Sequence, residues 1–284
     1  MEPSSPTQHS EGRYGPWAVV TGASDGIGRA CAYQIAERSQ GQGLVLVARR
    51  ERALVQLANE LEAKFGTRCR VLASDLSRPE HVSALIDACR DLDVGLLIAA
   101  AGFGTSGAFL DGEIGQELGM LDVNCRAVTQ LVHAFGRGMA ARKRGGIVLF
   151  SSLVAFQGVP NAAHYAATKA YIQTLAEGLH VELGRHGVDV IASAPGPVHS
   201  GFAGRANMTM GRAATPEMVA AKTLAALGRT MTVRPGMLSK LLEAALTLPR
   251  WGRVRIMEKV MGGMANHAPA LNAAAGDARN LDVR

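Results

Sequence analysis

Short apolar runs alternate along the chain with longer amphipathic stretches. The runs are rich in Val, Leu, Ile and Ala and are apolar at consecutive positions, which is typical of strands buried on both faces. They predict strands over Trp17–Thr21, Leu44–Ala48, Cys69–Ala73, Val94–Ala99, Gly146–Ser151 and Val188–Ala194. The stretches between them predict helices over Gly28–Arg38, Glu51–Phe65, Pro79–Arg90, about Gly115–Ala141, and Ala163–Arg185.

This alternation of buried strands and helices predicts an α/β fold. We expect a single doubly wound parallel sheet, a Rossmann fold, with helices on both faces and a C-terminal amphipathic helical extension. Thr215, Pro216 and Glu217 predict the start of a further helix, with Thr as N-cap and Pro at the first helical position. The expected organisation is a disordered leader over 1–14, a catalytic domain over 15–230, a basic helical extension over 231–264 and a disordered tail over 265–284.

Length and composition agree with a globular protein. The chain has 284 residues, of which 48% are hydrophobic and 19% charged, enough for one large α/β domain. No apolar run approaches the roughly 18 residues of a membrane helix, and the polar N-terminus lacks the apolar region of a signal peptide. The four cysteines show no paired spacing and the eight histidines form no cluster. We therefore predict a cytoplasmic protein with free thiols and no metal site.

The net charge of +6 is concentrated near the C-terminus. Residues 229–260 carry seven Lys or Arg against two Glu, so the chain does not predict a nucleic-acid-binding face. Within this segment, residues 237–261 form two amphipathic stretches on either side of Pro249. They could pack on a partner subunit, on the mouth of the substrate site, or on an anionic membrane surface. We rank packing or an oligomer contact before membrane contact.

A glycine-rich turn follows the first strand. Thr21-Gly-Ala-Ser-Asp-Gly-Ile-Gly28 leads directly into the first helix, where backbone amides can bind phosphate. Its glycines, Gly22, Gly26 and Gly28, would allow a tight turn, close approach to a pyrophosphate and close packing of helix on strand. The position in the first strand–helix unit favours a dinucleotide site over an unoccupied turn.

The end of the second strand favours one nicotinamide cofactor. A site for NAD places an acidic residue there for the ribose hydroxyl, whereas a 2′-phosphate favours arginine. This chain has Arg49 and Arg50 at that point and no acid, so we predict NADP(H), with Arg49 as the better phosphate ligand. The alternative is that both arginines are solvated charges at the start of a helix. Asp25 in the glycine turn weakens the prediction slightly.

Tyr165 and Lys169 are spaced four residues apart on a predicted helix. This spacing puts phenol and ammonium on one face, where the cation would lower the tyrosine pKa towards the value an acid–base catalyst needs. Ser151 and Ser152 end the preceding strand, and Asn124 lies earlier in the chain.

With these residues the chain resembles the short-chain dehydrogenase/reductase family, in its branch with Thr-Gly-x-x-x-Gly-x-Gly and Tyr-x-x-x-Lys motifs. The resemblance covers about residues 15–230. It implies that Tyr165 is the acid–base catalyst, that Lys169 lowers its pKa and binds the nicotinamide ribose, and that Ser152 orients the substrate carbonyl. Asn124 would hold a water of the proton relay. It also implies a homodimer or homotetramer built on the helices that hold Asn124 and Tyr165.

The resemblance extends to the rest of the cofactor site. Asp75 and Leu76 resemble a pair that contacts adenine, and Pro195–Ser200 resembles the loop over the nicotinamide, with Ser200 in place of a threonine. The full set of expected cofactor ligands is Gly22, Ser24, Asp25, Gly26, Ile27, Gly28, Arg49, Arg50, Asp75, Leu76, Ala101, Gly102, Tyr165, Lys169, Pro195, Gly196, Val198 and Ser200.

One stretch departs from the family pattern. After the fourth strand the family has Asn-Asn-Ala-Gly, whereas this chain has Ala99-Ala100-Ala101-Gly102. The asparagines brace neighbouring backbone and transfer neither proton nor hydride. We therefore interpret the alanines as the loss of a structural brace that puts rigidity and cofactor affinity in question, but not the reaction.

The substrate side is less defined by sequence. In this family residues 201–214 would form a mobile lid, and Phe103, Leu153, Phe202 and Met208, with Phe156 and Met210, would line an apolar pocket. We expect an NADP(H)-dependent oxidoreductase (EC 1.1.1.-) acting on an apolar ketone, an acyl substrate or the corresponding alcohol. The alternatives are a catalytically silent nucleotide-binding sensor or interaction protein on this fold, and a membrane-associated reductase of lipids.

Overall fold

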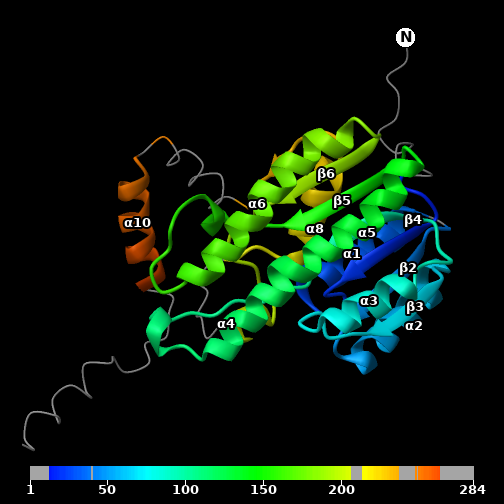
Figure 1. Ribbon diagram of the computed structural model, residues 1–284. Helices are drawn as coiled ribbons and strands as arrows, with labels where there is room; N and C mark the ends of the chain where they lie inside the picture. Colours follow the sequence, from blue (N-terminus) through cyan, green and yellow to red (C-terminus); the bar gives the residue numbers. More distant parts are fainter. Residues whose placement is uncertain (1–12, 40, 206–212, 237–246, 248, 263–284) are drawn as a thin grey trace, which may run out of the picture.

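The computed structural model describes residues 13–39, 41–205, 213–236, 247 and 249–262 and contains one parallel sheet covered on both faces (Figure 1). The strands are β1 (Trp17–Thr21), β2 (Gly43–Ala48), β3 (Cys69–Ala73), β4 (Val94–Ala99), β5 (Gly145–Phe150), β6 (Val188–Ser193) and β7 (Thr232–Val233). Their order in the sheet is β3-β2-β1-β4-β5-β6-β7, and every neighbouring pair is parallel.

Helices cover both faces of this sheet. They are α1 (Gly26–Arg38), α2 (Glu51–Phe65), α3 (Pro79–Asp87), α4 (Ile114–Leu121), α5 (Val128–Ala141), α6 (Ala163–Gly184), α7 (Phe202–Arg205), α8 (Pro216–Ala226) and α10 (Arg250–Gly262). Short helical turns are η1 (Phe109–Asp111), η2 (Asp122–Ala127) and η3 (Leu153–Phe156).

Alternating side chains of each strand enter two separate cores, because successive residues of a strand face opposite sides. Ala18 and Val20 of β1 pack with residues of α1, α2 and α8, whereas Val19 packs with residues of α3, α5 and α6. This two-sided burial explains why the strands read as continuous apolar runs. The predicted fold class is confirmed.

The strand order reverses between β1 and β4, since the chain first builds outwards through β2 and β3 and then returns. In open sheets of this kind a crevice forms at the carboxyl ends of the two strands where the order reverses. The glycine turn follows β1 at this edge, and the alanine stretch follows β4. The topology therefore brings both segments to one place.

The six predicted strands are confirmed to within one residue at each end. Helix α1 begins at Gly26 rather than Gly28, because Asp25 is the extended N-cap residue. The helix expected to end at Arg90 ends at Asp87 and continues as a turn. The helical stretch expected over Gly115–Ala141 is continuous, but its middle, η2, is a π-helical turn.

Two further features differ from the prediction. Strand β7 was not predicted; it has only two residues and pairs with the edge of β6. Arg13 and Tyr14 were assigned to a disordered leader, but both side chains bind the Asp189 carboxylate, at 2.7 and 2.8 Å. The rest of the leader, the predicted tail from 265, Met208, Met210 and residues 237–246 lie outside the described residues. No helix in the described ranges has the length and hydropathy to cross a bilayer.

Candidate active site

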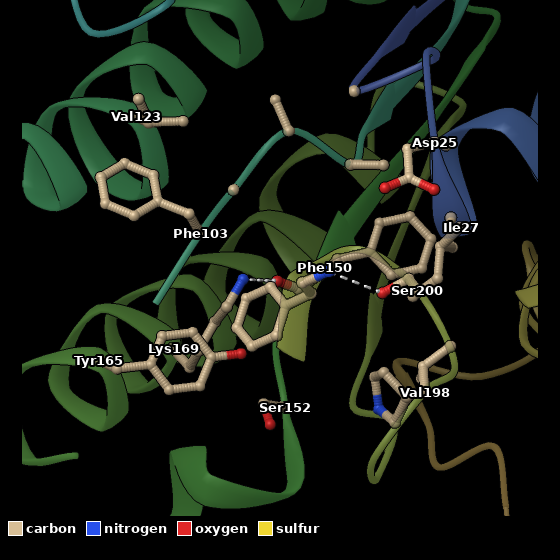
Figure 2. A pocket seen from close by; sticks show the side chains of 18 of the residues that line it. Asp25, Ile27, Phe103, Val123, Phe150, Ser152, Tyr165, Lys169, Val198 and Ser200 are labelled. Atoms are coloured by element: carbon tan, nitrogen blue, oxygen red, sulfur yellow. Dashed lines mark hydrogen bonds between the residues drawn. The ribbon is translucent and has the colours of Figure 1, made fainter. Parts of the chain in front are cut away.

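A cavity of about 500 Å³ lies at the carboxyl ends of β1 and β4. One end is formed by the glycine turn, by the residues after β2 and β3, and by the loop after β6. The other end is formed by Tyr165 and by residues from α4, η3 and α10. Figure 2 shows Tyr165, Lys169 and Ser152 grouped on one side, with Asp25 and Ile27 on the other. All the expected cofactor ligands line this one cavity.

The glycine turn requires glycine at two positions for steric reasons. Gly22 has φ +68°, and a Cβ there would lie 2.8 Å from the carbonyl oxygen of Ala100. A Cβ on Gly28 would lie 2.4 Å from the carbonyl oxygen of Gly22, because α1 begins directly against the turn. The turn is thus closed tightly on the end of β4 and leaves the amino end of α1 open to the cavity, where it can bind an anion.

Arg49 and Arg50 have different surroundings. The Arg50 guanidinium donates hydrogen bonds to the carbonyl oxygen and hydroxyl of Ser24, at 3.1 and 3.2 Å, and lies 3.9 Å from the Asp25 carboxylate. Asp25 in turn accepts a hydrogen bond from the Gly201 amide, which connects the glycine turn to the loop after β6. Arg49 lines the cavity, is exposed, and has no hydrogen-bond partner among the described residues. Its guanidinium is therefore available for a ligand.

Asp75 lies at the same end of the cavity. Desolvation raises its pKa, but hydrogen bonds from the Ser77 amide and hydroxyl, together with the positive charges of Arg49 and Arg78, lower the pKa by more. The net effect is a pKa below the ordinary value, so Asp75 is a carboxylate at neutral pH. It can accept hydrogen bonds from amino or hydroxyl groups of a nucleotide.

The alanine side chains that follow and end β4 are packed against the two cores. Ala99 is 4% exposed and belongs to the core on the α5 side, Ala101 packs against the same core, and Ala100 packs on the α1 side. The Thr21 hydroxyl accepts a hydrogen bond from the Ala101 amide at 3.0 Å and donates one to the Ile98 carbonyl oxygen at 3.4 Å. The alanine side chains are thus packed in the two cores, and the Thr21 hydroxyl binds the backbone amide of Ala101.

This arrangement makes the Thr21 hydroxyl important for stability. We expect Thr21→Val to lower the free energy of unfolding by about 1–3 kcal/mol, because the shape is preserved while the partly buried Ala101 amide loses its acceptor. Thr21→Ser keeps the hydroxyl and serves as the control. Urea unfolding of the three proteins measures the difference. A Val variant as stable as the Ser variant would contradict this role of the hydroxyl.

Ser152 and Tyr165 face each other in the cavity. The Ser151 hydroxyl donates to the Lys169 carbonyl oxygen inside the protein, which leaves Ser152 as the serine available to a ligand. Burial raises the pKa of Tyr165 above its ordinary value, and a hydrogen bond with Ser152 lowers it by less. Tyr165 is therefore a neutral phenol at physiological pH, able to donate a proton. Lys169 was expected to lower this pKa, and burial, which has the largest effect on it, acts in the opposite direction.

Lys169 is 8% exposed, and its ammonium group donates a hydrogen bond to the Phe150 carbonyl oxygen at 2.8 Å. Burial lowers the pKa of Lys169 to about 8. Its Nζ lies 5.7 Å from the centre of the Tyr165 ring. The bond to β5 fixes the ammonium beside the cavity wall (Figure 2).

Asn124 lies behind the wall of the cavity. Its side-chain amide donates to the Phe103 carbonyl oxygen at 2.9 Å and to the Thr168 hydroxyl at 3.0 Å, and its oxygen accepts from the Phe103 amide. It does not line the cavity, unlike the other three predicted catalytic residues. Asn124 belongs to the π-helical turn η2, a feature frequent at functional sites. Helical periodicity alone did not reveal this turn.

The substrate end of the cavity is largely apolar. Phe103, Leu153 and Phe202 line it as predicted, and the Phe202 ring lies 5.5 Å from the Tyr165 ring. Phe156 does not line it; its ring lies beneath the Arg234 guanidinium, 4.6 Å away. The residues that sequence analysis missed come from elements whose position depends on the tertiary fold. They are Gly115, Gln116, Gly119, Val123, Val154, Ala162, Met257 and Val260.

Helix α10 closes this end of the cavity. Met257 is 2% exposed and packs with Val154, Val159 and Tyr165. The Arg253 guanidinium donates to the Phe156 carbonyl oxygen at 3.0 Å. These contacts show that α10 packs on the mouth of the substrate site, which is one of the three roles expected for residues 237–261. Trp251, on the same helix, is 75% exposed.

Known proteins resemble this chain over most of its described length. The family model for short chain dehydrogenases matches residues 16–211. A 7beta-hydroxysteroid dehydrogenase of Clostridium sardiniense is 35% identical over 65% of this chain and 70% of its own length. A very-long-chain 3-oxoacyl-CoA reductase of Podospora anserina is 38% identical over 66% of this chain, but the match spans only 56% of the reductase. A rat protein named inactive hydroxysteroid dehydrogenase-like protein 1 is 32% identical over 64% of this chain and 56% of its own length.

Solved structures show the same fold. The structure of a 7beta-hydroxysteroid dehydrogenase superposes with a TM-score of 0.79 and 27% identity, over 86% of this chain and 97% of that one. A short-chain dehydrogenase from Sphingobium yanoikuyae in complex with NADPH superposes with a TM-score of 0.73 and 27% identity, over 90% and 99% of the two chains.

Proposed function

Because the chain belongs to the short-chain dehydrogenase family, we propose that it is an NADP(H)-dependent oxidoreductase that interconverts a ketone and a secondary alcohol. The observation that supports this most strongly is the joint position of Ser152, Tyr165 and Lys169 on the wall of a cavity whose other end is the glycine turn. The relatives that carry dehydrogenase or reductase names support it further.

The cofactor end of the cavity fits a phosphorylated dinucleotide. The amino end of α1 and the close-packed glycine turn leave room for a pyrophosphate, and the Arg49 guanidinium is available beside Asp75. A 2′-phosphate would pair with Arg49, while Arg50 holds the turn through Ser24. The complex of a structural relative with NADPH supports the same cofactor. The bound nicotinamide would supply or accept the hydride.

Side chains of the protein then donate or accept the proton. Ser152 and the Tyr165 hydroxyl would hold the substrate oxygen between them, and the neutral phenol would donate its proton to that oxygen as the alcohol forms. The buried ammonium of Lys169 would stabilise the phenolate that remains until the proton is replaced. In the direction of oxidation the phenolate would accept the proton. Apolar side chains around Tyr165 exclude water from this step.

The apolar substrate end supports a lipophilic ketone or a 3-oxoacyl group as substrate.

We also propose a homo-oligomer, because large apolar side chains such as Leu118 and Leu121 on α4 are at least 40% exposed. A catalytically silent role is the second candidate, since one relative carries a name that calls it inactive. Turnover of any ketone by the purified protein excludes that role.

Cofactor preference gives the first test. We expect tight binding of NADPH and weak binding of NADH, because the Arg49 guanidinium would form charge-assisted hydrogen bonds with the 2′-phosphate. Arg49→Ala should weaken NADPH binding roughly 10- to 100-fold and leave NADH unchanged. Arg52→Ala is the matched control, because Arg52 is an exposed arginine in the first turn of α2 and does not line the cavity. Calorimetric titration measures both cofactors, and an equal loss for NADH would contradict the assignment.

A further inference from the structure

A buried carboxylate lies next to the catalytic helix and has no part in the proton transfer described above. Glu117 on α4 is 6% exposed, and its Oε2 accepts a hydrogen bond from His164 Nδ1 at 2.6 Å. His164 immediately precedes Tyr165 in the first turn of α6. The pair therefore joins α4 to the start of the helix that carries the catalytic tyrosine (Figure 1).

The two elements joined by this pair form opposite parts of the substrate end. Gly115, Gln116 and Gly119 of α4 line the cavity, with Glu117 between them and directed at α6. Tyr165 and Ala162 line the cavity from the start of α6. The separation of α4 and α6 therefore sets the distance between the substrate wall and the Tyr165 hydroxyl.

The loop before α4 makes two further contacts with the start of α6. The Gly107 amide donates a hydrogen bond to the carbonyl oxygen of Asn161, which has φ +60° just before the helix begins. The Phe109 ring meets the His164 ring edge-on, with 6.2 Å between the ring centres.

Stability alone does not explain a buried carboxylate at this place. An apolar pair of similar volume is often as stable as a buried ion pair, because burial of charge costs desolvation energy. The hydrogen bond between Glu117 and His164 offers something else, namely a single short contact with a fixed direction. Catalysis is sensitive to displacements of about 1 Å, so such a bond has value next to an acid–base catalyst.

We propose that Glu117 and His164 are positioning residues that hold Tyr165 at a fixed distance from the α4 wall of the substrate pocket. The proposal rests on the proposed reductase function for its kinetic test, and on the structure alone for its structural test. Both residues act through the backbone of α6, since neither lines the cavity.

The test uses the full chain, NADPH and a cyclic ketone such as 1-decalone. Glu117→Gln and His164→Gln should each lower kcat about 10- to 100-fold while the Kd for NADPH stays within twofold. The double variant should be no slower than either single one, because both substitutions weaken the same hydrogen bond. The primary isotope effect with 4-deuterated NADPH should rise, since hydride and proton transfer become rate-limiting.

Two further variants separate positioning from stability. Glu117→Leu with His164→Leu replaces the hydrogen-bonded pair by an apolar contact, and we expect it to keep the melting temperature but not kcat. Glu60→Gln breaks the 2.6 Å ion pair between Arg29 on α1 and Glu60 on α2, and should leave kcat unchanged. Full activity of the Leu pair would overturn the proposal.

Amide hydrogen exchange tests the same proposal without turnover. Glu117→Gln should speed exchange over residues 163–169 at least fivefold relative to the centre of α5. Unchanged exchange there would overturn the positioning role. If wild-type protein binds NADPH but reduces no ketone, the proposed function fails, and faster exchange over 163–169 still supports the positioning role.

Discussion

Replacing Tyr165 by phenylalanine is expected to lower kcat for ketone reduction roughly 100- to 10,000-fold, the range typical for loss of a general acid. The substitution removes only the hydroxyl, and the ring keeps its contacts with Phe202 and Met257. NADPH affinity should therefore stay within about twofold. Stopped-flow or steady-state kinetics measures kcat, and calorimetry measures cofactor binding.

Tyr171→Phe is the matched control for this substitution. Tyr171 lies on the same helix, is 43% exposed, and shares a hydrogen bond with the Thr129 hydroxyl at 2.7 Å. It should retain wild-type kcat. If Tyr165→Phe also retained kcat, another group would have to supply the proton, and the role assigned to Tyr165 would be wrong.

The raised pKa of Tyr165 also predicts a direction of pH dependence. Reduction uses the neutral phenol, so its rate should not decline as the pH rises from about 6 to 9 on account of Tyr165. Oxidation uses the phenolate, so its rate should rise over the same interval.

Lys169→Met is expected to abolish most activity and yet stabilise the protein without added cofactor. Burial lowers the pKa of Lys169 to about 8, below its ordinary value of 10.5. Between these values the unfolded chain holds the proton and the folded chain has lost it, so stability rises with pH. Below pH 8 the folded protein bears the full cost of a buried ammonium. A shift of this size corresponds to about 3 kcal/mol.

The gain from Lys169→Met is smaller than that cost, because the Phe150 carbonyl oxygen loses its partner. We expect the free energy of unfolding to rise by about 1–2 kcal/mol at pH 7. By about pH 10.5 the gain should be gone and the variant should be the less stable protein, because only the loss of the hydrogen bond to Phe150 remains. Urea unfolding at both pH values measures it. Lys222→Met, at an exposed position on α8, should change stability by less than about 0.5 kcal/mol. A gain that persists at high pH would contradict the assigned cause.

The pattern of apolar and polar residues along the chain predicts most of the fold. Strands buried on both faces are apolar at every position, so β1 to β6 could be located to within one residue. Strand β7 could not, because two residues form no pattern and their pairing with β6 depends on the completed sheet. The π-helical turn at Asn124 was hidden for a similar reason, since the six residues of η2 are too few to show a change of helical period.

The cofactor end of the site could be predicted because its parts follow strands whose ends meet at one edge of the sheet. The substrate end could not, because Met257 and Val260 come from α10, which does not directly follow any of the six predicted strands. Nor does sequence show that the Ser151 hydroxyl turns inwards to α6 while Ser152 faces the cavity. That division depends on packing between β5 and α6.

Helix α10, which forms part of the wall of the substrate end, is synthesised after all the other parts of the site. The chain leaves the ribosome amino end first, so the residues of the cofactor end are all available once residue 200 has emerged. Met257 follows more than fifty residues later. All residues of the cofactor end are thus synthesised before the residues of α10 that close the substrate end. A chain terminated before residue 250 would contain every residue of the cofactor end but would lack Met257 and Val260, which line the substrate end.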